Sequence, residues 1–468
     1  MGQQIERLAE FVATTRWEDV PEPVRRHAKL VLLDTLGVIL AGSARPEVRD
    51  LRGRLAGPAP RDQRSRGDPK SAGKGATVYA SGWPSCDPRT AALLNGIAGR
   101  SIELCEGLRF VSGQAAVQVL PGVLAVGEQL GRSGSEILAA FVLGYDVAGR
   151  LAGGFTPRPL AHQNGQVLLL AAAAAGARLF GFDAAGVSRA MRVAAVLMLT
   201  PSYTNAVAGA TALNVAGGIS GFAAALAPEL ALAGFTAQDD AIEEALGQLV
   251  GAGFTAEGLC DELGARWEIA RNYFRLYACC NPIHPALDCF AEILAELRPH
   301  PEEIAQIEVA TYRFASVMRN PDPPNYFASK YSLPHAAATM AVRGHAGFAA
   351  LDDSALQDAT IAALRRRVAV REDPAMSALA PRLRPARVTV TLADGRSLTR
   401  SRDSHRGDFE HPFAEAEIRA KFRELAVTVL TPDGAQAVER AVDHAEEWPN
   451  LSALVDLMRR HASTGNPR

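Results

Sequence analysis

The stretch AVAGATALNVAGGISGFAAALA, residues 206–227, contains no charged side chain. By length alone it could cross a lipid bilayer. However, Ala and Gly dominate it, and it lacks the density of Leu, Ile and Phe that is typical of a membrane-spanning helix. Thr211 and Asn214 add polar groups. We therefore predict a central helix that is buried among other helices in a protein core.

The segments on either side of this stretch have the same character. Between residues 87 and 253, Ala- and Leu-rich segments with apolar residues at helical spacing follow one another, and no convincing alternating strand interrupts them. Two earlier segments, residues 5–14 and 24–40, also predict helices, whereas residues 55–75, rich in Pro, Gly, Arg and Asp, predict a loop. The helices predicted in the central region span residues 89–99, 117–130, 134–151, 166–180, 184–199, 213–233 and 237–249.

The pattern changes after Gly264. Residues 285–297 still predict a helix, but residues 304–312 (IAQIEVATY) alternate as a β-strand does, and so do residues 368–371 and 387–392. Ala393-Asp394-Gly395 is a hairpin turn signal, and residues 397–400 complete the hairpin. Helices return near the end of the chain, at residues 414–425, 435–444 and 451–461.

Together these patterns predict a mainly α fold with two domains. Residues 1–270 and 411–468 form a large, discontinuous all-helical domain, and residues 271–410 form a smaller α+β domain inserted into it. A cleft between two such domains is the usual place for a ligand site.

The charge balance and the cysteines limit the partners and the compartment. The 468 residues carry 49 Lys and Arg against 51 Asp and Glu, a net charge of −2, which offers no electrostatic case for binding nucleic acid or an anionic membrane. The six cysteines are scattered without a CxxC pair, which indicates a reduced, cytoplasmic protein. Glu6, Arg7 and Glu10 interrupt the first residues, so we expect no signal peptide.

Six segments in order along the chain resemble the MmgE/PrpD family, which includes 2-methylcitrate dehydratases, cis-aconitate decarboxylases and iminodisuccinate epimerases. Each segment alone is a weak signal, but six in the family's order are a strong one. The segments are VRRHAKLVLLDTLGVILAGS (residues 24–43), AALLNG (91–96), HQNGQVLLLAAAAAGARLFGF (162–182), YACCNPIHPALD (277–288), SKYSLPHAAA (329–338) and EHPFAEAEIRAKFRELA (410–426).

The resemblance implies a fold, an assembly and a reaction class. Family members have a large helical domain and a smaller lid domain, and they usually form homodimers through the helical part. They act on small carboxylic acids, beside a carboxylate, without a metal, flavin, nicotinamide or pyridoxal cofactor. The chain accordingly has no GxGxxG after a strand, no Walker loop and no HExxH motif.

Four residues at family motif positions are candidates for acid/base chemistry. His162 in AHQNG and His284 in CCNPIHPALD, where Cys280 and His284 fit the family's Cys-x-x-x-His pattern, are candidate catalytic groups. Lys330 in SKYSLPH matches the family's lysine, and His335 stands where the family often has Tyr. The alternatives are a helix-capping role for His162, a structural role for His284 and a surface position for Lys330. Cys280 is interpreted as a packing residue.

The chain departs from the family's motif after the Asn-Gly pair, Asn95 and Gly96. Arg100 stands where the dehydratases have His, and Glu103, Cys105 and Glu106 stand where they have aspartates. An arginine stays protonated near pH 7, so Arg100 can hold a carboxylate but cannot act as an acid or base. The next family motif aligns with Gln114-Ala115-Ala116, and a family lysine and histidine align with Ala212 and Val215. The predicted substrate-binding residues are Asn95, Arg100, Glu103, Gln114 and Tyr331.

Three functions remain open on this sequence. The first is a cofactor-independent lyase, of the dehydratase or decarboxylase type, that transfers protons beside a carboxylate in an altered active site. The second is an isomerase or epimerase with His162 facing His284 or Lys330 across one carbon. The third is a catalytically inactive family member that binds a ligand. In each case the expected partner is a small carboxylate, and the retained chemistry is expected on the lid side.

Overall fold

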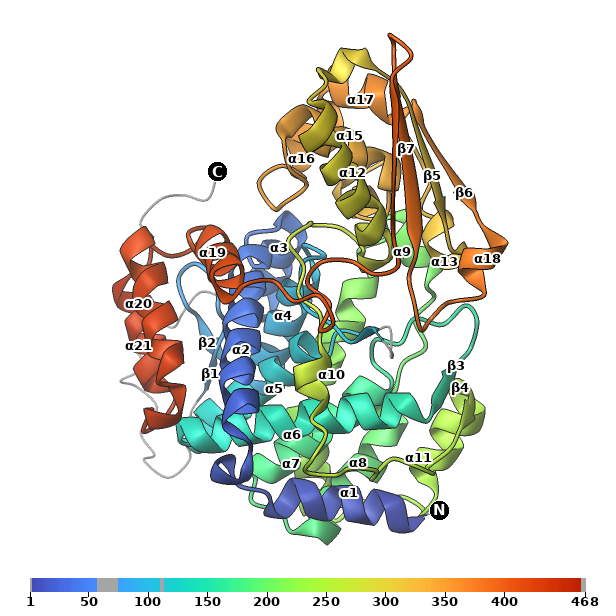
Figure 1. Cartoon of the computed structure of the whole chain (residues 1–468). Helices are drawn as coiled ribbons and strands as arrows, with labels where there is room; N and C mark the ends of the chain where they lie inside the picture. Colours follow the sequence, from blue (N-terminus) through green and yellow to red (C-terminus); the bar gives the residue numbers. More distant parts are fainter. Residues whose placement is uncertain (1, 57–74, 110–112, 464–468) are drawn as a thin grey trace.

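The computed structural model describes residues 2–56, 75–109 and 113–463 (Figure 1). Helices make up 57% of the structure and strands 11%, so the fold is mainly α. A body of helices carries a smaller, sheet-bearing part at one end (Figure 1). The helices of the first part of the chain are α1 (Gly2–Thr14), α2 (Glu22–Gly42), α3 (Pro46–Leu55), α4 (Pro88–Arg100), α5 (Ala116–Leu130), α6 (Gly134–Gly153), α7 (Val167–Leu179), α8 (Ala184–Ala194), α9 (Thr204–Ala208), α10 (Leu213–Leu232) and α11 (Ala241–Glu244).

Helix α10 lies at the centre of this body and packs against α4, α5, α7 and α8. Small residues bring the helix backbones into contact: a Cβ added at Gly96 in α4 would lie 2.8 Å from the Cα of Gly218 in α10. By length and apolar composition α10 also passes as a possible membrane span, but 61% of that window is buried inside the protein. Burial of this kind is what the sequence predicts for a central core helix.

The last helices of the chain return to the body and cover α2. They are α19 (Glu415–Ala426), α20 (Pro432–Asp443) and α21 (Ser452–Arg460). Lys421 of α19 forms a buried ion pair of 2.6 Å with Asp34 of α2. Beside this pair, a Cβ added at Gly37 would lie 3.2 Å from the ring of Phe422, so the two helices are in close contact.

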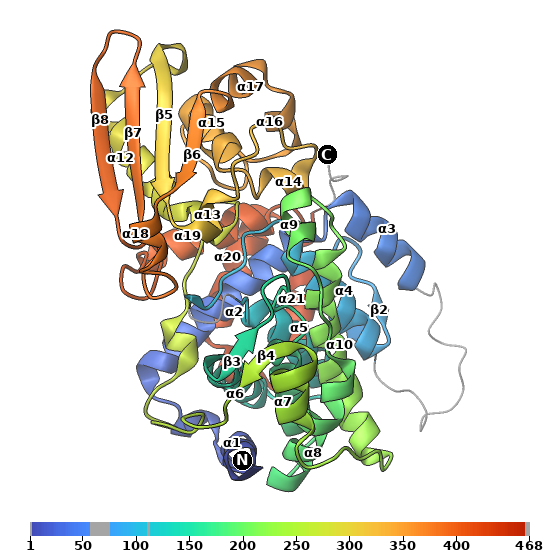
Figure 2. The same cartoon turned by 90° about the vertical axis from the view of Figure 1, so that its right-hand side faces the viewer.

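The sheet-bearing part contains four strands in the order β6-β5-β7-β8. Strand β5 (Ile304–Thr311) runs parallel to β6 (Val368–Glu372) and antiparallel to β7 (Ala386–Leu392), which pairs antiparallel with β8 (Ser397–Arg402) (Figure 2). Its helices are α12 (His284–Leu297), α13 (Arg313–Ser316), α14 (Tyr326–Ser329), α15 (Leu333–Arg343), α16 (Asp353–Gln357), α17 (Ala359–Arg365) and α18 (Pro374–Ser377). These elements bury a second apolar cluster, which also includes Val38, Ala41 and Leu213 of the helical body.

Most predicted elements occur within a few residues of their expected bounds, with three exceptions. Helix α8 ends at Ala194, not near residue 199, because the backbone N–H of Leu199 bonds to the carbonyl of Gly165 and no longer continues the helix. The helix predicted at residues 237–249 consists of α11 and a π-turn, Ala245–Leu249. The loop predicted at residues 55–75 is not one of these exceptions, because most of it lies outside the described residues.

The third exception is the expectation that no strand interrupts residues 87–253, which is wrong. Strand β3 (Phe155–Pro157) pairs antiparallel with β4 (Gly251–Phe254). Gly251 fits there because it lies against the carbonyl of Leu246, where a Cβ would approach to 2.0 Å. A second short pair, β1 (Ala76–Thr77) with β2 (Ser85–Cys86), precedes α4. Strands of two to four residues are too short to show an alternating pattern in a sequence.

Candidate active site

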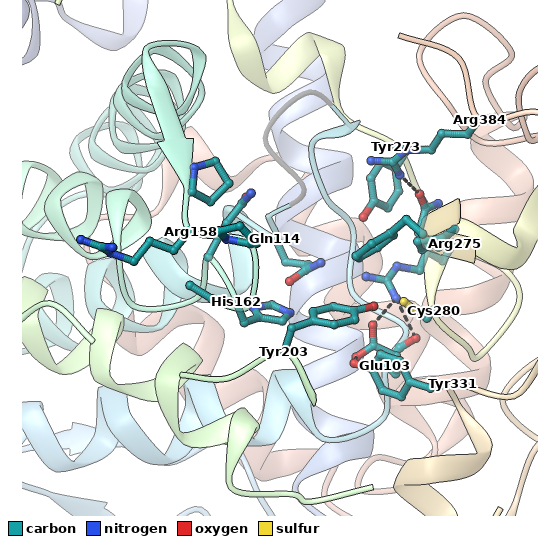
Figure 3. A pocket seen from close by; sticks show the side chains of 17 residues that line it. Glu103, Gln114, Arg158, His162, Tyr203, Tyr273, Arg275, Cys280, Tyr331 and Arg384 are labelled. Carbon is teal, nitrogen blue, oxygen red and sulfur yellow. Dashed lines mark hydrogen bonds and ion pairs between the residues drawn. The ribbon is translucent and has the colours of Figure 1, made fainter. Parts of the chain in front are cut away.

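A cavity of about 250 Å³ lies where residues of the helical body meet residues that follow position 270 (Figure 3). Its walls combine three arginines, three tyrosines, one histidine and one glutamate with apolar side chains. Such a mixture of apolar walls and a few convergent polar groups is typical of a small-molecule site. The lining residues are Glu103, Gln114, Pro157, Arg158, Pro159, Ala161, His162, Gln163, Tyr203, Tyr273, Arg275, Cys280, Asn281, Pro282, Phe314, Tyr331 and Arg384.

Glu103 is the only carboxylate among these lining residues, and it is held by two buried arginines. Arg100 Nη2 donates to Glu103 Oε2 at 3.0 Å, and Arg275 Nη1 donates to Oε1 at 2.7 Å. The hydroxyl of Tyr331 adds a hydrogen bond to Oε2 at 2.9 Å. Burial opposes ionisation of Glu103, but the charges of Arg100 and Arg275 outweigh it and lower its pKa to about 2. The carboxylate is therefore ionised at any working pH.

A turn after α4 points Glu103 into the cavity. Helix α4 ends at Arg100, and Glu103 adopts a left-handed backbone conformation with φ of 51°. This conformation is uncommon for residues other than Gly and Asn. Here Arg275 stabilises the turn, because its Nη1 also donates to the backbone carbonyl of Glu103 at 3.1 Å.

Two guanidinium groups share this one carboxylate, so the buried cluster keeps an excess positive charge. Arg275 lines the cavity with its side chain fully buried, and its Nε and Nη2 atoms have no hydrogen-bond partner among the described residues. Buried donors without partners are costly, so they mark a place where a ligand can supply the acceptor. The cavity is thus prepared for an anion, and a carboxylate fits the planar guanidinium best.

His162 lies on the opposite side of the cavity from Arg275 and Arg384 (Figure 3). Its Nδ1 accepts the backbone N–H of Asn164 at 3.2 Å, so the proton of the neutral ring is on Nε2. The ring stacks on Tyr203 with an interplanar angle of 10°. Burial, with Arg100 as the next cause, lowers the pKa of His162 to about 3, so the imidazole is neutral near pH 7.

Models of the MmgE/PrpD N-terminal and C-terminal domains match residues 6–254 and 277–447. The chain belongs to the MmgE/PrpD family. Its relatives include cis-aconitate decarboxylase from Homo sapiens, 23% identical over 80% of this chain and 79% of that protein. Cis-aconitate decarboxylase from Aspergillus terreus is 22% identical over 96% of this chain and 95% of its own length. Glu103 and His162 fall in the first matched segment and Arg384 in the second, whereas Arg275 lies between the two.

Five of the nine residues predicted from the family motifs gather at this site. His162, Glu103, Gln114 and Tyr331 line the cavity, and Arg100 lies behind Glu103. Asn95 does not take part: its side chain bonds to the backbone of Thr77 and Tyr79, which fixes the segment before α4.

The other motif residues, His284, Lys330 and His335, do not line the cavity. His284 Nε2 lies 3.1 Å from the carbonyl of Cys279, which also accepts from Arg275 Nη1, so His284 is placed behind the cavity wall. Burial, and next the neighbouring His405, lower its pKa well below the usual value. The arrangement in which His284 or Lys330 faces His162 across a cleft is therefore absent from the described structure.

Lys330 and His335 are also buried away from the cavity. The ammonium of Lys330 donates to the carbonyl of Leu351 and lies 4.0 Å from the centre of the Tyr326 ring. Burial lowers its pKa to about 7. His335 Nδ1 is 3.4 Å from Nη1 of Arg365, and burial lowers the pKa of His335 to about 3. Sequence motifs alone cannot distinguish a polar residue that faces a cavity from one that lies behind its wall.

Several cavity residues were not predicted from the sequence. Arg275 could have been noticed, since it stands in RNYFRLYACC beside the family motif with aromatic neighbours. No comparable sequence signal marks Arg384, Tyr203 or Tyr273. Within the described ranges, no group of three or more His, Cys, Asp or Glu side chains is placed to hold a metal ion.

Proposed function

We propose that the protein is a cofactor-independent lyase, of the dehydratase or decarboxylase type, that acts beside a carboxylate of a small carboxylic acid. The observation that carries the proposal is Arg275, a fully buried cation that lines the cavity and has two donor atoms without a partner among the described residues. The family and its relatives named cis-aconitate decarboxylase support the same reaction class. Arg275 is proposed to hold a substrate carboxylate bidentately.

The positive charge at Arg275 suits either lyase reaction. In decarboxylation the bond to the departing carboxylate breaks, CO2 leaves, and its electron pair stays on the substrate until a proton reaches carbon. In dehydration a proton and a hydroxide leave from neighbouring carbons. Both reactions place negative charge next to a remaining carboxylate, and a preorganised cation at that carboxylate stabilises the transition state.

His162 is proposed to act as a neutral hydrogen-bond donor. Because Nδ1 is occupied by the N–H of Asn164, the ring presents Nε2–H as its free donor, and its low pKa keeps it neutral. A neutral imidazole can donate to an oxygen on which charge develops, as the substrate carboxylate or the departing hydroxyl would require. This role differs from the two-way proton transfer that the sequence suggested for His162.

We also propose that residues 271–410 form a lid over the helical domain of residues 1–270 and 411–468. The four-stranded sheet within this segment supports the division, and so does a cavity lined from both sides. The homodimer and the cytoplasmic location predicted from the sequence belong to the same proposal. Light scattering of the purified protein tests the dimer.

An epimerase is the less favoured alternative. A two-base epimerase needs proton-transfer groups on both faces of one carbon. Among the described lining residues, His162 is the only imidazole and no lysine is present. On the far wall Cys280 is a poor base, because burial raises the pKa of its thiol to about 12.

The test is a set of small carboxylates, including cis-aconitate and 2-methylcitrate, incubated with the protein in D2O and followed by NMR. A lyase gives a new product with loss of CO2 or water. An epimerase gives exchange at the α-carbon without loss of either. Binding without conversion of any compound would contradict the lyase proposal and favour an inactive, ligand-binding member.

The matched control for the site is a second histidine with the same local contact. Nδ1 of His345 accepts the backbone N–H of Gly347 at 3.2 Å, as His162 does from Asn164, but His345 is exposed and away from the cavity. We expect His162→Gln to lower kcat by about 100-fold or more, the usual effect of removing one donor to a developing charge. His345→Gln should retain the activity of the wild type.

A further inference from the structure

Arg384 reaches the cavity from the segment just before β7 and is held by two acceptors on the protein. Its Nη2 donates to the backbone carbonyl of Arg109 at 2.7 Å, and its Nη1 donates to Oδ1 of Asn281. Only 6% of Arg384 is exposed. These contacts fix the guanidinium against the cavity wall, where a long and flexible side chain would otherwise adopt many rotamers.

Asn281 is oriented in turn by His405. The Nδ1 atom of His405 lies 2.7 Å from the backbone oxygen of Arg406, which can only accept, so Nδ1 carries the proton. Nε2 therefore keeps its lone pair and accepts from Nδ2 of Asn281 at 2.8 Å. The amide oxygen of Asn281 is then left to face Arg384. Each hydrogen-bond direction follows from the one before it.

The buried surroundings keep this chain of hydrogen bonds in one direction. His405 is fully buried, and burial together with the cations Arg384 and Arg109 lowers its pKa to about 3, although the Arg406 carbonyl opposes the shift. Its Nε2 also lies 3.8 Å from Asp408 Oδ2. A neutral His405 accepts a hydrogen bond from the Asn281 amide. The reversed amide would lose this bond and would place its NH2 group against the donors of Arg384.

We propose that Asn281 and His405 are positioning residues that hold Arg384 as a fixed binding group for a substrate carboxylate. The inference rests on the proposed function, because it assigns a binding position to one carboxylate of the proposed substrate. Arg384 and His162 lie on opposite sides of the cavity (Figure 3), so Arg384 binds a carboxylate other than the group that contacts His162. Loss of Arg384 should therefore raise KM more than it lowers kcat.

The test measures binding as well as turnover. Tricarballylate, a saturated tricarboxylate without a hydroxyl group, can occupy a carboxylate site without being dehydrated, so its Kd from isothermal titration calorimetry is independent of catalysis. We expect Arg384→Gln to raise this Kd by about tenfold or more, as expected for the loss of a charge-assisted contact. We expect His405→Leu, which removes the acceptor for Asn281, to raise the Kd by about fivefold to tenfold.

Two further variants separate positioning from general damage to the fold. His405→Gln carries a side-chain oxygen that can accept from Asn281, and it should recover most of the affinity lost in His405→Leu. If His405 acts through Arg384, His405→Leu should have little further effect on Kd in the Arg384→Gln background. Should His405→Leu not fold, the smaller His405→Ala replaces it in the same cycle, because it also removes the acceptor for Asn281.

The outcomes distinguish this inference from the proposed lyase activity. An unchanged Kd in Arg384→Gln, or equal losses from His405→Leu in both backgrounds, would overturn the inference. A wild-type protein that does not bind tricarballylate would also overturn it. If the cycle behaves as expected but no carboxylate is converted, the inference stands and the lyase proposal fails.

Discussion

Glu103 and Arg275 form an ion pair of 2.7 Å in which neither side chain is more than 2% exposed. Its two partners lie in the helical region and in the segment just before the sheet-bearing part. Arg100 binds the other oxygen of the same carboxylate, so one glutamate holds two cations in a dry environment. This cluster connects the stability of the fold to the charge of the cavity.

The first prediction concerns Glu103→Gln. Removal of the carboxylate leaves Arg100 and Arg275 buried without a counter-charge, which should lower the free energy of unfolding by about 3–5 kcal/mol. Urea denaturation at pH 7 measures the change. Tyr331→Phe is the matched comparison, because it removes only the hydroxyl bond to Glu103 and should cost about 1.5–3 kcal/mol. A smaller loss in Glu103→Gln than in Tyr331→Phe would contradict the role of the ion pairs.

The second prediction concerns the pH dependence of stability through Lys330. Burial lowers its pKa from 10.5 to about 7, so between these values the unfolded chain binds a proton that the folded protein has released. Stability should therefore rise with pH from about 7 upward, and below pH 7 this dependence should vanish because both states are protonated. Lys330→Met should remove the rise. Unfolding at pH 7, 8 and 9 tests it, and an equal difference between the two proteins at all three pH values would speak against it.

The third prediction concerns the contact between α4 and α10. A Cβ at Gly218 would lie 2.5 Å from the carbonyl oxygen of Leu93, so Gly218→Ala should destabilise the protein by about 1–3 kcal/mol. Gly53 in α3 has no atom of the described residues within 4 Å of an added Cβ. Gly53→Ala should therefore stabilise by about 0.5–1 kcal/mol through helix propensity alone. Thermal unfolding of both variants checks the sign of each change, and a stabilising Gly218→Ala would be inconsistent with direct backbone contact.

The fourth prediction concerns the pH profile of activity. Because the pKa of His162 is about 3, its imidazole stays neutral between pH 5 and 9, and it should contribute no limb to the profile of kcat/KM in that range. The profile is measured with any carboxylate that the protein converts. A limb near pH 6.5 that disappears in His162→Gln would show that the residue titrates during the reaction and would exclude a permanently neutral donor.

The sequence predicted elements better than it predicted the site. Apolar spacing located the long helices, and the turn at Ala393-Asp394-Gly395 located the β7–β8 hairpin, because both signals are local. Family motifs named His162, Glu103 and Tyr331, which line the cavity. They also named four residues that are buried elsewhere, Asn95, His284, Lys330 and His335, since a motif does not record which way a side chain points.

The residues that the sequence did not reveal depend on long-range contacts. Arg275 meets Glu103 across 172 positions, and Arg384 meets Asn281 across 103. An arginine in such a pairing has the same local pattern as an arginine on the surface. Only the folded structure shows that Arg275 is fully buried and that two of its donor atoms have no partner in the described part of the chain, which is the observation on which the proposed function rests.

The packing of α19 on α2 has a consequence for biosynthesis. Asp34 is made before Lys421, its buried partner, which follows it by 387 positions (421 minus 34). Until Phe422 is made, the face of α2 around Gly37 lacks the ring that packs against it. An apolar surface exposed in this way promotes aggregation of the nascent chain. Completion of the helical core therefore has to follow the synthesis of α19.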